Sequence, residues 1–103
     1  MGKVRWTNRA RNDLQAIHEY IAVDNPTVAF RVVWRIASAA ERLSRFSLSG
    51  RIVPEYESSG VRELVVRPYR IAYRLVGEDV RILKIHHGAR VLRIQDIEDE
   101  REA

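Results

Sequence analysis

The sequence predicts an α+β fold in which a helical hairpin packs on one face of a small antiparallel-rich sheet. Two segments with helical apolar spacing come first, and three or four strand-like segments follow them. A run of helices followed by a run of strands is typical of α+β domains. The 103 residues suffice for one domain with a single modest core, and 46% of them are hydrophobic.

The first half of the chain predicts the helical hairpin. After a short strand at residues 3–6, Asn8 can cap a helix that runs to about residue 22, with an apolar stripe of Ala10, Leu14, Ile17 and Ile21. Pro26 cannot continue this helix but suits the first turn of a second one, capped by Asn25 and running to about residue 45. Because only a few residues join the two helices, we expect them to lie antiparallel.

The second half predicts the sheet. Residues 51–57 can form a short peripheral strand, since the proline at position 54 favours a sheet edge. Further strands are expected at about residues 61–67, 69–76 and 80–86, the last two joined by a tight hairpin. The middle strand places Tyr69, Ile71, Tyr73 and Leu75 on one face and Arg70, Ala72 and Arg74 on the other. With the helices on the first face, we expect the arginine-bearing face to be open.

The charge is basic and unevenly distributed. The formal net charge is +4, but the last eight residues, DIEDEREA, hold five acids and one arginine, so residues 1–95 carry 17 basic and 9 acidic side chains. We therefore divide the chain into a single domain at residues 1–95 and an acidic tail at residues 96–103. The tail is either a solvated end, a segment folded back on the arginine face, or part of a short final helix from Val91.

The basic residues are 16 arginines and 2 lysines. Arginine makes planar, bidentate contacts to phosphate or carboxylate, so the bias fits a recognition surface for an anionic partner. A genome rich in G and C would favour arginine codons in any case, and the sequence leaves both explanations open.

Composition and motifs exclude several classes of function. The chain has no cysteine, which removes disulfides and thiolate metal sites and is consistent with the cytoplasm. No apolar run is long enough to span a membrane, and we expect no membrane partner. There is neither a glycine-rich phosphate loop nor a nucleophile elbow. We expect no cofactor and no metal, because the adjacent His86 and His87 diverge on a strand and His18 lies on a helix.

Residues 61–90 hold the groups that metal-free RNA cleavage requires, namely cations for the phosphate and a proton donor or acceptor. The candidate catalytic residues are Arg62, Arg70, His87 and Arg90. His86 is an alternative to His87, because a strand must point one of the two to each face, and the sequence does not say which is exposed. Glu63 is a further possible base, although it alternates away from Arg62.

Each of these residues also has a structural interpretation. The arginines can belong to a solvated sheet face, paired with Glu55, Glu57 or Glu63. Phe30 and Trp34 stack at positions i and i+4 of the second helix, where they either pack in the core or anchor a partner in a groove.

The chain resembles the RelE/ParE superfamily of toxins from type II toxin–antitoxin modules. The resemblance covers nearly the whole chain and is carried by Trp6 leading into ARNDLQAIHEYIAVDNPTVAFR, a Gly50-Arg51 turn, VRELVV, PYRIAYRL and ILKIHHGAR. It implies the same fold, with elements in the order β-α-α-β-β-β(-β). It also implies a cognate antitoxin, whose extended, often acidic segment wraps the toxin and through which alone operator DNA is bound. The partner-binding candidates are Phe30, Trp34, Arg67 and Arg74.

The superfamily has two kinds of target. RelE-like members are ribosome-dependent mRNA endonucleases, and Arg70 and Arg90 match two of their basic residues, with Arg62 a looser third match. No tyrosine follows Arg90, so His87 would have to substitute for the terminal catalytic residue. ParE-like members poison DNA gyrase, and DLQAIHEYIAVDNP and HHGAR look more like theirs. We therefore expect a gyrase poison, with mRNA cleavage as the alternative and an inactive, antitoxin-binding member as the third possibility.

Overall fold

The computed structural model describes residues 2–53 and 59–102, and within them the predicted fold class is confirmed. The elements are β1 (Val4–Trp6), α1 (Asn8–Ala22), α2 (Pro26–Arg42), β2 (Arg51–Ile52), β3 (Arg62–Val66), β4 (Tyr69–Val76), β5 (Asp79–His87) and the 3₁₀ turn η2 (Ile94–Asp96). The strands form one sheet in the order β1-β5-β4-β3-β2. Among the strands of the described residues, only β1 pairs in parallel with its neighbour, and the other pairs are antiparallel.

Of the two predicted helix caps, one is confirmed and one is corrected. Asn25 caps α2 as expected, since its side chain accepts a hydrogen bond from the Val28 N–H at 3.1 Å. At α1 the cap is Thr7 rather than Asn8, which is the first helical residue. The Thr7 hydroxyl accepts from the Ala10 N–H at 3.1 Å and donates to the Ile82 carbonyl at 2.8 Å. Thr7 therefore joins α1 to β5 as well as starting the helix, a tertiary role that sequence spacing does not reveal.

Other boundaries shift by a few residues. The second helix ends at Arg42 instead of residue 45, because the Leu43 N–H bonds to the Ala40 carbonyl and the last turn tightens. β2 covers only the start of the strand predicted at residues 51–57, and Pro54, Glu55 and Glu57 lie outside the described residues.

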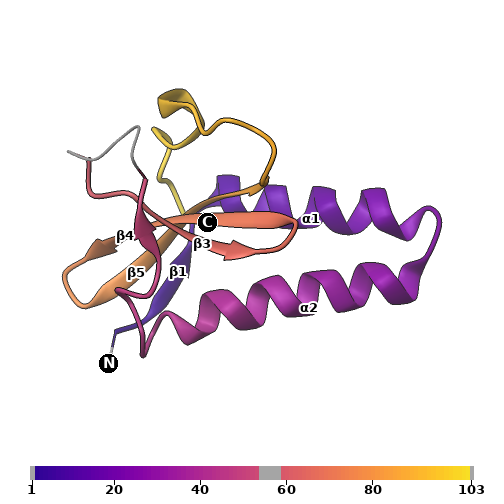
Figure 1. Ribbon diagram of the computed structural model, residues 1–103, viewed down its shortest axis with the longest axis horizontal. Helices are drawn as coiled ribbons and strands as arrows, with labels where there is room; N and C mark the ends of the chain where they lie inside the picture. Colours follow the sequence, from indigo (N-terminus) through magenta and orange to yellow (C-terminus); the bar gives the residue numbers. More distant parts are fainter. Residues whose placement is uncertain (1, 54–58, 103) are drawn as a thin grey trace.

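Both helices pack on one face of the sheet (Figure 1). The core on this face is built from small and branched side chains of the helices and strands: Ala10, Ile36, Ala39, Ala40, Leu43, Ile71, Tyr73, Val80, Ile82 and Ile85. The alternation predicted for the middle strand is confirmed, since Ile71 and Tyr73 are both fully buried on the helix side. None of the helices in the described residues could cross a membrane.

The opposite face is not open, which corrects the sequence-based expectation. A second apolar cluster lies there, made of Val53, Val61, Ala72, Leu83, Leu92 and Ile97. Leu92 and Ile97 belong to the C-terminal segment, which returns over the sheet and is drawn in yellow above the strands in Figure 1. Ala72 and Leu83 present apolar surface on this face, and burying it favours the return of the chain. The fold-back interpretation of the acidic tail is therefore the one observed.

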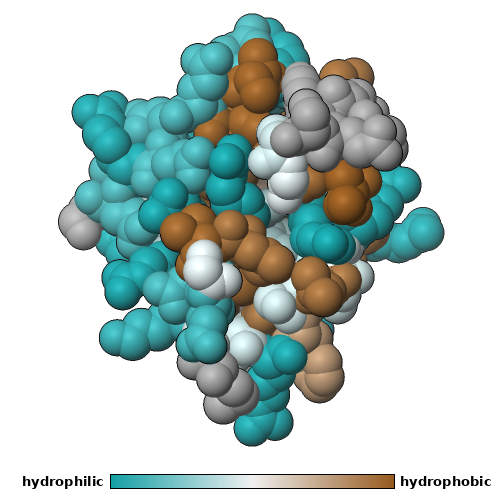
Figure 2. Space-filling view, turned by 90° about the vertical axis from the view of Figure 1, so that its left-hand side faces the viewer, coloured by the Kyte–Doolittle hydropathy of each residue, from teal (hydrophilic) through white to brown (hydrophobic). Residues whose placement is uncertain are grey.

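The surface at the end of the molecule where the β4–β5 turn lies is mixed in character. Figure 2 shows hydrophilic side chains over most of this face, with hydrophobic patches between them. Exposed apolar residues in small groups are normal for a globular protein and need no partner to explain them.

Tyr73 connects the core to the loop that follows α2. Its ring is fully buried, and its hydroxyl accepts from the Gly50 N–H at 2.9 Å and donates to the Ser47 carbonyl at 2.8 Å. A Cβ atom at Gly50 would lie 2.6 Å from the Tyr73 ring, so only glycine permits this close approach. Burial raises the pKa of the Tyr73 hydroxyl against the opposing effect of the Gly50 contact, so the group stays protonated.

We expect Tyr73→Phe to destabilise the fold by about 1–3 kcal/mol, because it leaves the buried Gly50 N–H and the partly buried Ser47 carbonyl without partners while preserving the ring. The measurement is the free energy of unfolding in urea. Tyr20→Phe is the matched control, since Tyr20 is 83% exposed and the same change there should cost less than about 0.5 kcal/mol. Equal effects at the two positions would show that the Tyr73 hydroxyl does not hold the loop.

Candidate functional site

The register of β4 and β5 decides which histidine is buried. His86 is directly opposite Arg70, and His87 is directly opposite Tyr69. His86 therefore lies on the face away from the helices and is 6% exposed. His87 lies on the helix side, exposed to solvent, with its ring edge-on to Tyr69 at a centroid distance of 5.8 Å.

The four candidate catalytic residues do not share one face of the sheet. Arg62 is opposite Tyr73 on the helix side, where its guanidinium donates to the Gly50 carbonyl at 2.8 Å. Arg70 lies on the opposite face. Arg90 follows β5 and lines a pocket with Lys84 and His86, and its guanidinium makes no hydrogen bond or ion pair with the described residues. The sequence-based set of Arg62, Arg70, His87 and Arg90 is thus divided between the two faces.

A different cluster forms around Arg70. The carboxylate of Glu63 is 5% exposed and lies 2.5 Å from the Arg70 guanidinium and 3.0 Å from that of Arg51. The Nε2 atom of His86 is 4.0 Å from the second oxygen of the same carboxylate. The buried Glu63 carboxylate is therefore paired with two arginines and lies beside one histidine. The two arginines compensate its negative charge, which would otherwise be costly to bury.

The electrostatics of this cluster limit its chemistry. Burial lowers the pKa of His86, and the attraction of Glu63 only partly opposes that effect, so His86 is neutral at pH 7. Its Nδ1 atom has no hydrogen-bond partner among the described residues. A neutral imidazole can accept a proton, but the positive charge of Arg70 is already engaged by Glu63. Because Glu63 already neutralises Arg70, the cluster of Glu63, Arg70 and His86 is poorly suited to binding an anion through Arg70. It is better suited to orienting other groups beside a bound anion.

A cavity of about 420 Å³ lies next to this cluster. It is bounded by polar and apolar side chains of β3, β4 and the segment after β5: Arg51, Val65, Arg67, Pro68, Tyr69, Arg70, Gly88 and Ala89.

Sequence reasoning gave Glu63 and His86 less weight than Arg62 and His87. The signal that identifies them is pairing register, because residues directly opposite on adjacent strands share a face.

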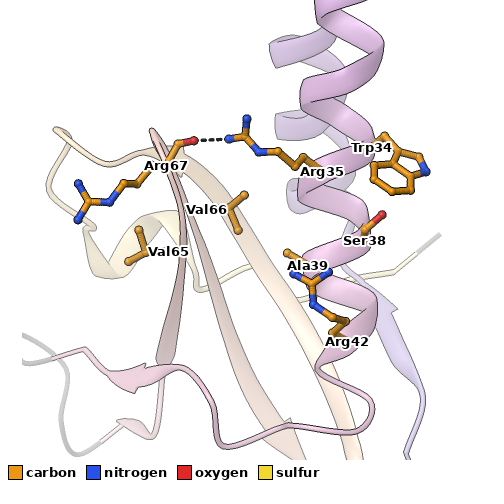
Figure 3. Close-up of a pocket in the computed structure, with 8 residues that line it drawn as sticks. All are labelled: Trp34, Arg35, Ser38, Ala39, Arg42, Val65, Val66 and Arg67. Atoms are coloured by element: carbon orange, nitrogen blue, oxygen red, sulfur yellow. Dashed lines mark hydrogen bonds between the residues drawn. The ribbon is translucent and has the colours of Figure 1, made fainter.

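A second, larger groove lies between α2 and β3 (Figure 3). We call it the α2–β3 groove. Its volume is about 750 Å³, and its lining residues are Trp34, Arg35, Ser38, Ala39, Arg42, Val65, Val66 and Arg67. The Arg35 guanidinium reaches across it and donates to the Arg67 carbonyl. Two of the predicted partner-binding residues, Trp34 and Arg67, therefore border the same groove, although their side chains point away from each other (Figure 3).

The aromatic residues of α2 are surface residues. Phe30 is 65% exposed and Trp34 is 63% exposed, so their interpretation as core residues is wrong. They project from α2 on the side away from its buried stripe of Ala29, Ile36 and Ala40. Trp6, by contrast, packs against the core on the helix side.

The backbone of β3 borders the same groove. Among the described residues, β2 pairs with β3 only at Arg62 and Glu63. The outer edge of β3 from Leu64 to Val66 is then without a neighbouring strand in the described part of the chain. An unpaired edge presents backbone N–H and C=O groups to which another extended chain can add.

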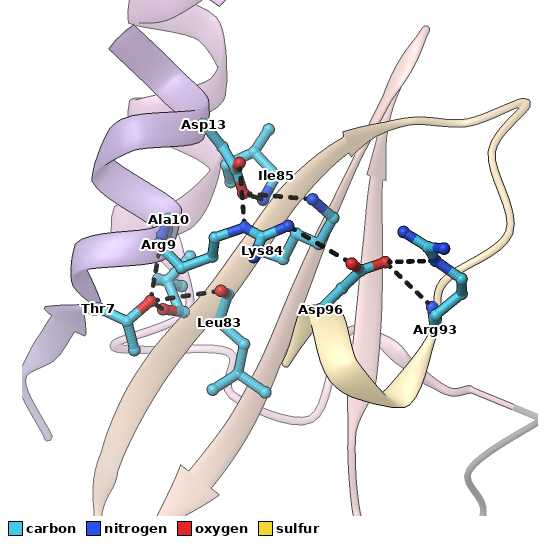
Figure 4. A network of polar contacts seen from close by, with 10 residues as sticks. Thr7, Arg9, Ala10, Asp13, Leu83, Lys84, Ile85, Arg93 and Asp96 are labelled. Atoms are coloured by element: carbon cyan, nitrogen blue, oxygen red, sulfur yellow. Dashed lines mark hydrogen bonds and ion pairs between the residues drawn. The ribbon is translucent and has the colours of Figure 1, made fainter. Parts of the chain in front are cut away.

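The start of α1 is tied to β5 by Asp13 (Figure 4). Its carboxylate accepts from the Ile85 N–H at 3.0 Å and lies 3.7 Å from the Lys84 ammonium and 3.6 Å from Arg9. β1 pairs with β5 only as far as Ile82, so Asp13 takes the place of a strand neighbour beyond that point. Burial raises the pKa of Asp13 despite these favourable contacts.

Asp96 of η2 is held on the other side of the same network (Figure 4). It accepts from the backbone N–H of Arg93 at 3.3 Å and pairs with Arg9 at 3.4 Å. Burial acts to raise the pKa of Asp96, but the hydrogen bonds from Arg93 outweigh it and the pKa is lowered. The network fixes the C-terminal segment to the first turn of α1. It has no grouping of three or more metal-ligating side chains within residues 2–53 and 59–102.

The remaining partner-binding candidate, Arg74, is far from the α2–β3 groove in this arrangement. It lies on the sheet face opposite the helices, directly across from Arg81. Its guanidinium is 3.4 Å from the Glu100 carboxylate of the C-terminal segment. Arg74 is thus engaged within the chain, whereas Phe30, Trp34 and Arg67 have exposed side chains.

Comparisons with known proteins agree on one family. The family model described as the ParE toxin of the type II toxin–antitoxin system parDE matches residues 4–92. Toxin RelE2 of Caulobacter vibrioides is 39% identical over 92 residues, which cover 88% of this chain and 100% of that protein. Toxin ParE3 of the same organism is 36% identical over 96 residues, covering 92% of this chain and 95% of that protein. The putative toxin Y4kP of Sinorhizobium fredii is 41% identical, covering 84% and 88%.

Two solved structures share the fold as well as part of the sequence. A chain of the chromosomal ParDE system from P. aeruginosa has a TM-score of 0.70 at 30% identity, covering 84% of this chain and 96% of that one. A chain of the toxin–antitoxin complex RelBE2 from Mycobacterium tuberculosis has a TM-score of 0.64 at 27% identity, covering 86% and 93%. With the family model spanning most of its length, this chain belongs to the ParE toxin family of type II toxin–antitoxin systems, within the RelE/ParE superfamily.

Proposed function

We propose that this toxin inhibits bacterial growth in the cytoplasm by poisoning DNA gyrase, as ParE-like members do. The observation that carries the proposal is the division of the expected RNase groups between two faces, with Arg62 and His87 on the helix side and Arg70 on the other. Metal-free cleavage needs its cations and its acid or base around one phosphate. A toxin that acts by binding a protein has no such requirement.

The match to a ParE toxin model over residues 4–92 supports the same target. The absence of a tyrosine after Arg90 supports it further, because the RelE-like mechanism commonly uses one there. Within the chain, Arg62 is committed to the Gly50 carbonyl and Arg70 to Glu63. The pairing with Glu63 compensates the charge of Arg70 and weakens its attraction for a transferring phosphate, whereas Arg62 lies on the other face.

The alternative is a RelE-like, ribosome-dependent mRNA endonuclease. It is favoured by the cluster of Glu63, Arg70 and His86 beside an open cavity, and by a relative named RelE2 at 39% identity. On this alternative His86 rather than His87 would act as the base, since it shares a face with Arg70. Arg90 would hold the phosphate.

Induction of the chain alone in a bacterial host, with parallel readouts of the DNA damage response and of mRNA 5′ ends, distinguishes the two targets. We expect a damage response with filamentation and intact messages. With purified protein, we expect stabilised gyrase–DNA cleavage complexes. New mRNA ends phased with codons, without a damage response, would contradict the proposal and make Arg70 and Arg90 catalytic candidates.

Arg90→Gln provides the matched variant for this experiment, because the Arg90 guanidinium has no hydrogen bond or ion pair to the described residues and its loss should leave the fold intact. Loss of mRNA cleavage by a factor of 100 or more, on the order expected when a transition-state cation is removed, would identify an RNase. No growth defect from the wild-type chain itself would identify an inactive family member.

We propose that the antitoxin partner docks in the α2–β3 groove through an acidic, extended segment. Three features of the groove support this occupant. Arg35 and Arg42 make it basic, exposed Trp34 supplies an aromatic anchor at its rim, and the edge of β3 beyond Glu63 can accept a strand. The antitoxin, and not this chain, would contact operator DNA.

We expect Trp34→Ala to weaken antitoxin binding by about 30-fold or more, since a buried aromatic anchor at an interface contributes about 2 kcal/mol or more. Isothermal titration calorimetry with the cognate antitoxin measures it. Tyr20→Ala is the control, because Tyr20 is also an exposed helical aromatic but lies outside the groove, so this variant should bind the antitoxin normally. Unchanged affinity for Trp34→Ala would place the antitoxin elsewhere.

A further inference from the structure

A row of three arginines crosses the sheet face opposite the helices. In the register of β1, β5 and β4, Arg5 is directly across from Arg81, and Arg81 is directly across from Arg74. We call these residues the arginine row. Like charges directly opposite on neighbouring strands destabilise a sheet unless an anion lies between them. At one end of the row, the Asp79 carboxylate is the anion for Arg5, at 3.3 Å from its Nε atom.

At the other two positions the anion comes from the C-terminal segment. The two oxygens of Glu100 divide between neighbouring arginines, one at 3.1 Å from Arg81 and the other at 3.4 Å from Arg74. Glu102, two residues further, lies 3.6 Å from the Nε atom of Arg81. Both carboxylates, two residues apart in the sequence, therefore reach the row from the same segment.

The C-terminal segment is held in place by a backbone hydrogen bond and by an apolar side chain, as a bound peptide would be. The Asn8 N–H, at the first helical position of α1, donates to the Arg101 carbonyl at 2.7 Å. Upstream, Ile97 is 1% exposed in the second apolar cluster and fixes the start of the segment. Between these anchors, Glu98 is exposed and makes no hydrogen bond or ion pair with the described residues. Contact with the row is therefore specific to Glu100 and Glu102.

The row keeps unused binding capacity while the segment is in place. The Nε atom of Arg74 is buried and has no hydrogen-bond partner among the described residues, and the buried Nε atom of Arg81 has only the 3.6 Å ion-pair contact with Glu102. Arg74 and Arg81 side chains are 30% and 29% exposed, so Coulomb attraction at this site is stronger than on an open surface. A second pair of carboxylates with better geometry would satisfy donors that Glu100 and Glu102 leave free.

We propose that the arginine row is a docking site for an acidic peptide of a partner protein with carboxylates two residues apart, and that residues 98–102 are the chain's own competing occupant. A peptide is the occupant that the geometry favours, because the observed occupant is a pair of carboxylates two residues apart whose backbone also accepts a hydrogen bond from the Asn8 N–H. A partner must displace the segment, so its apparent affinity is lowered by the fraction of time the row is occupied. The proposal does not depend on whether the target is gyrase or the ribosome.

The test uses a fluorescent peptide with the sequence of residues 98–102, Glu-Asp-Glu-Arg-Glu, added to the full chain, with binding followed by anisotropy. Glu100→Gln opens the row, and Glu98→Gln is the matched control with the same change in charge in the same segment. We expect Glu100→Gln to bind the peptide about tenfold more tightly than wild type, as when an occupant present about nine-tenths of the time is released. Glu98→Gln should match wild type.

Two further measurements keep the result unambiguous. Adding Arg74→Gln and Arg81→Gln to Glu100→Gln should abolish the gain, and thermal unfolding verifies that the variants fold. In wild type, excess peptide should speed hydrogen exchange at the Asn8 amide, because its acceptor on Arg101 is displaced. Equal affinity of Glu100→Gln and Glu98→Gln, or binding that survives loss of both arginines, overturns the proposal. Tighter binding of a single-stranded oligonucleotide than of the peptide would overturn it too, and assign the row to nucleic acid.

Discussion

The pairing of β4 with β5 is the constraint on which the other features of this toxin depend. It aligns Arg70 with His86, Tyr69 with His87 and Arg74 with Arg81, and it places each pair on a defined face. The irregularity at Ala72 and Tyr73 shifts the register within the same pair of strands. Because a shift of one residue moves every side chain to the opposite face, this ladder decides which charged groups can meet. The helices, the α2–β3 groove and the C-terminal segment are all placed against it.

Two acidic residues, Glu63 and Glu100, each compensate the charge of two arginines on the sheet face opposite the helices. Glu63 compensates Arg70 and Arg51 at one end, and Glu100 compensates Arg74 and Arg81 at the other. The first carboxylate is buried within the sheet, so its contacts are permanent parts of the fold. The second belongs to a returning segment with exposed neighbours, so its contacts can be exchanged for those of another chain. The same chemistry therefore has a structural role at one end and a recognition role, in our proposal, at the other.

The different roles of Glu63 and Glu100 also bear on the choice between the two proposed targets, gyrase and the ribosome. A cation that is already neutralised by a buried carboxylate contributes little to stabilising developing charge on a phosphate, and Arg70 is in that position. The exposed surface that remains is suited to macromolecular contact. It includes the exposed aromatic residues Trp34 and Phe30 of α2 and the open edge of β3.

The sequence by itself determined the fold class, the order of the elements and the alternation of the β4 strand, because apolar periodicity and turn residues are local signals. It also determined that adjacent histidines must point to opposite faces. Only the tertiary structure decided that His86 is the buried one, that Thr7 rather than Asn8 caps α1, that Phe30 and Trp34 are exposed, and that the face carrying Arg74 is covered by Leu92, Ile97 and Glu100. Each of these depends on strand register or on contacts between residues far apart in the chain, and neither is encoded in the spacing of neighbouring residues.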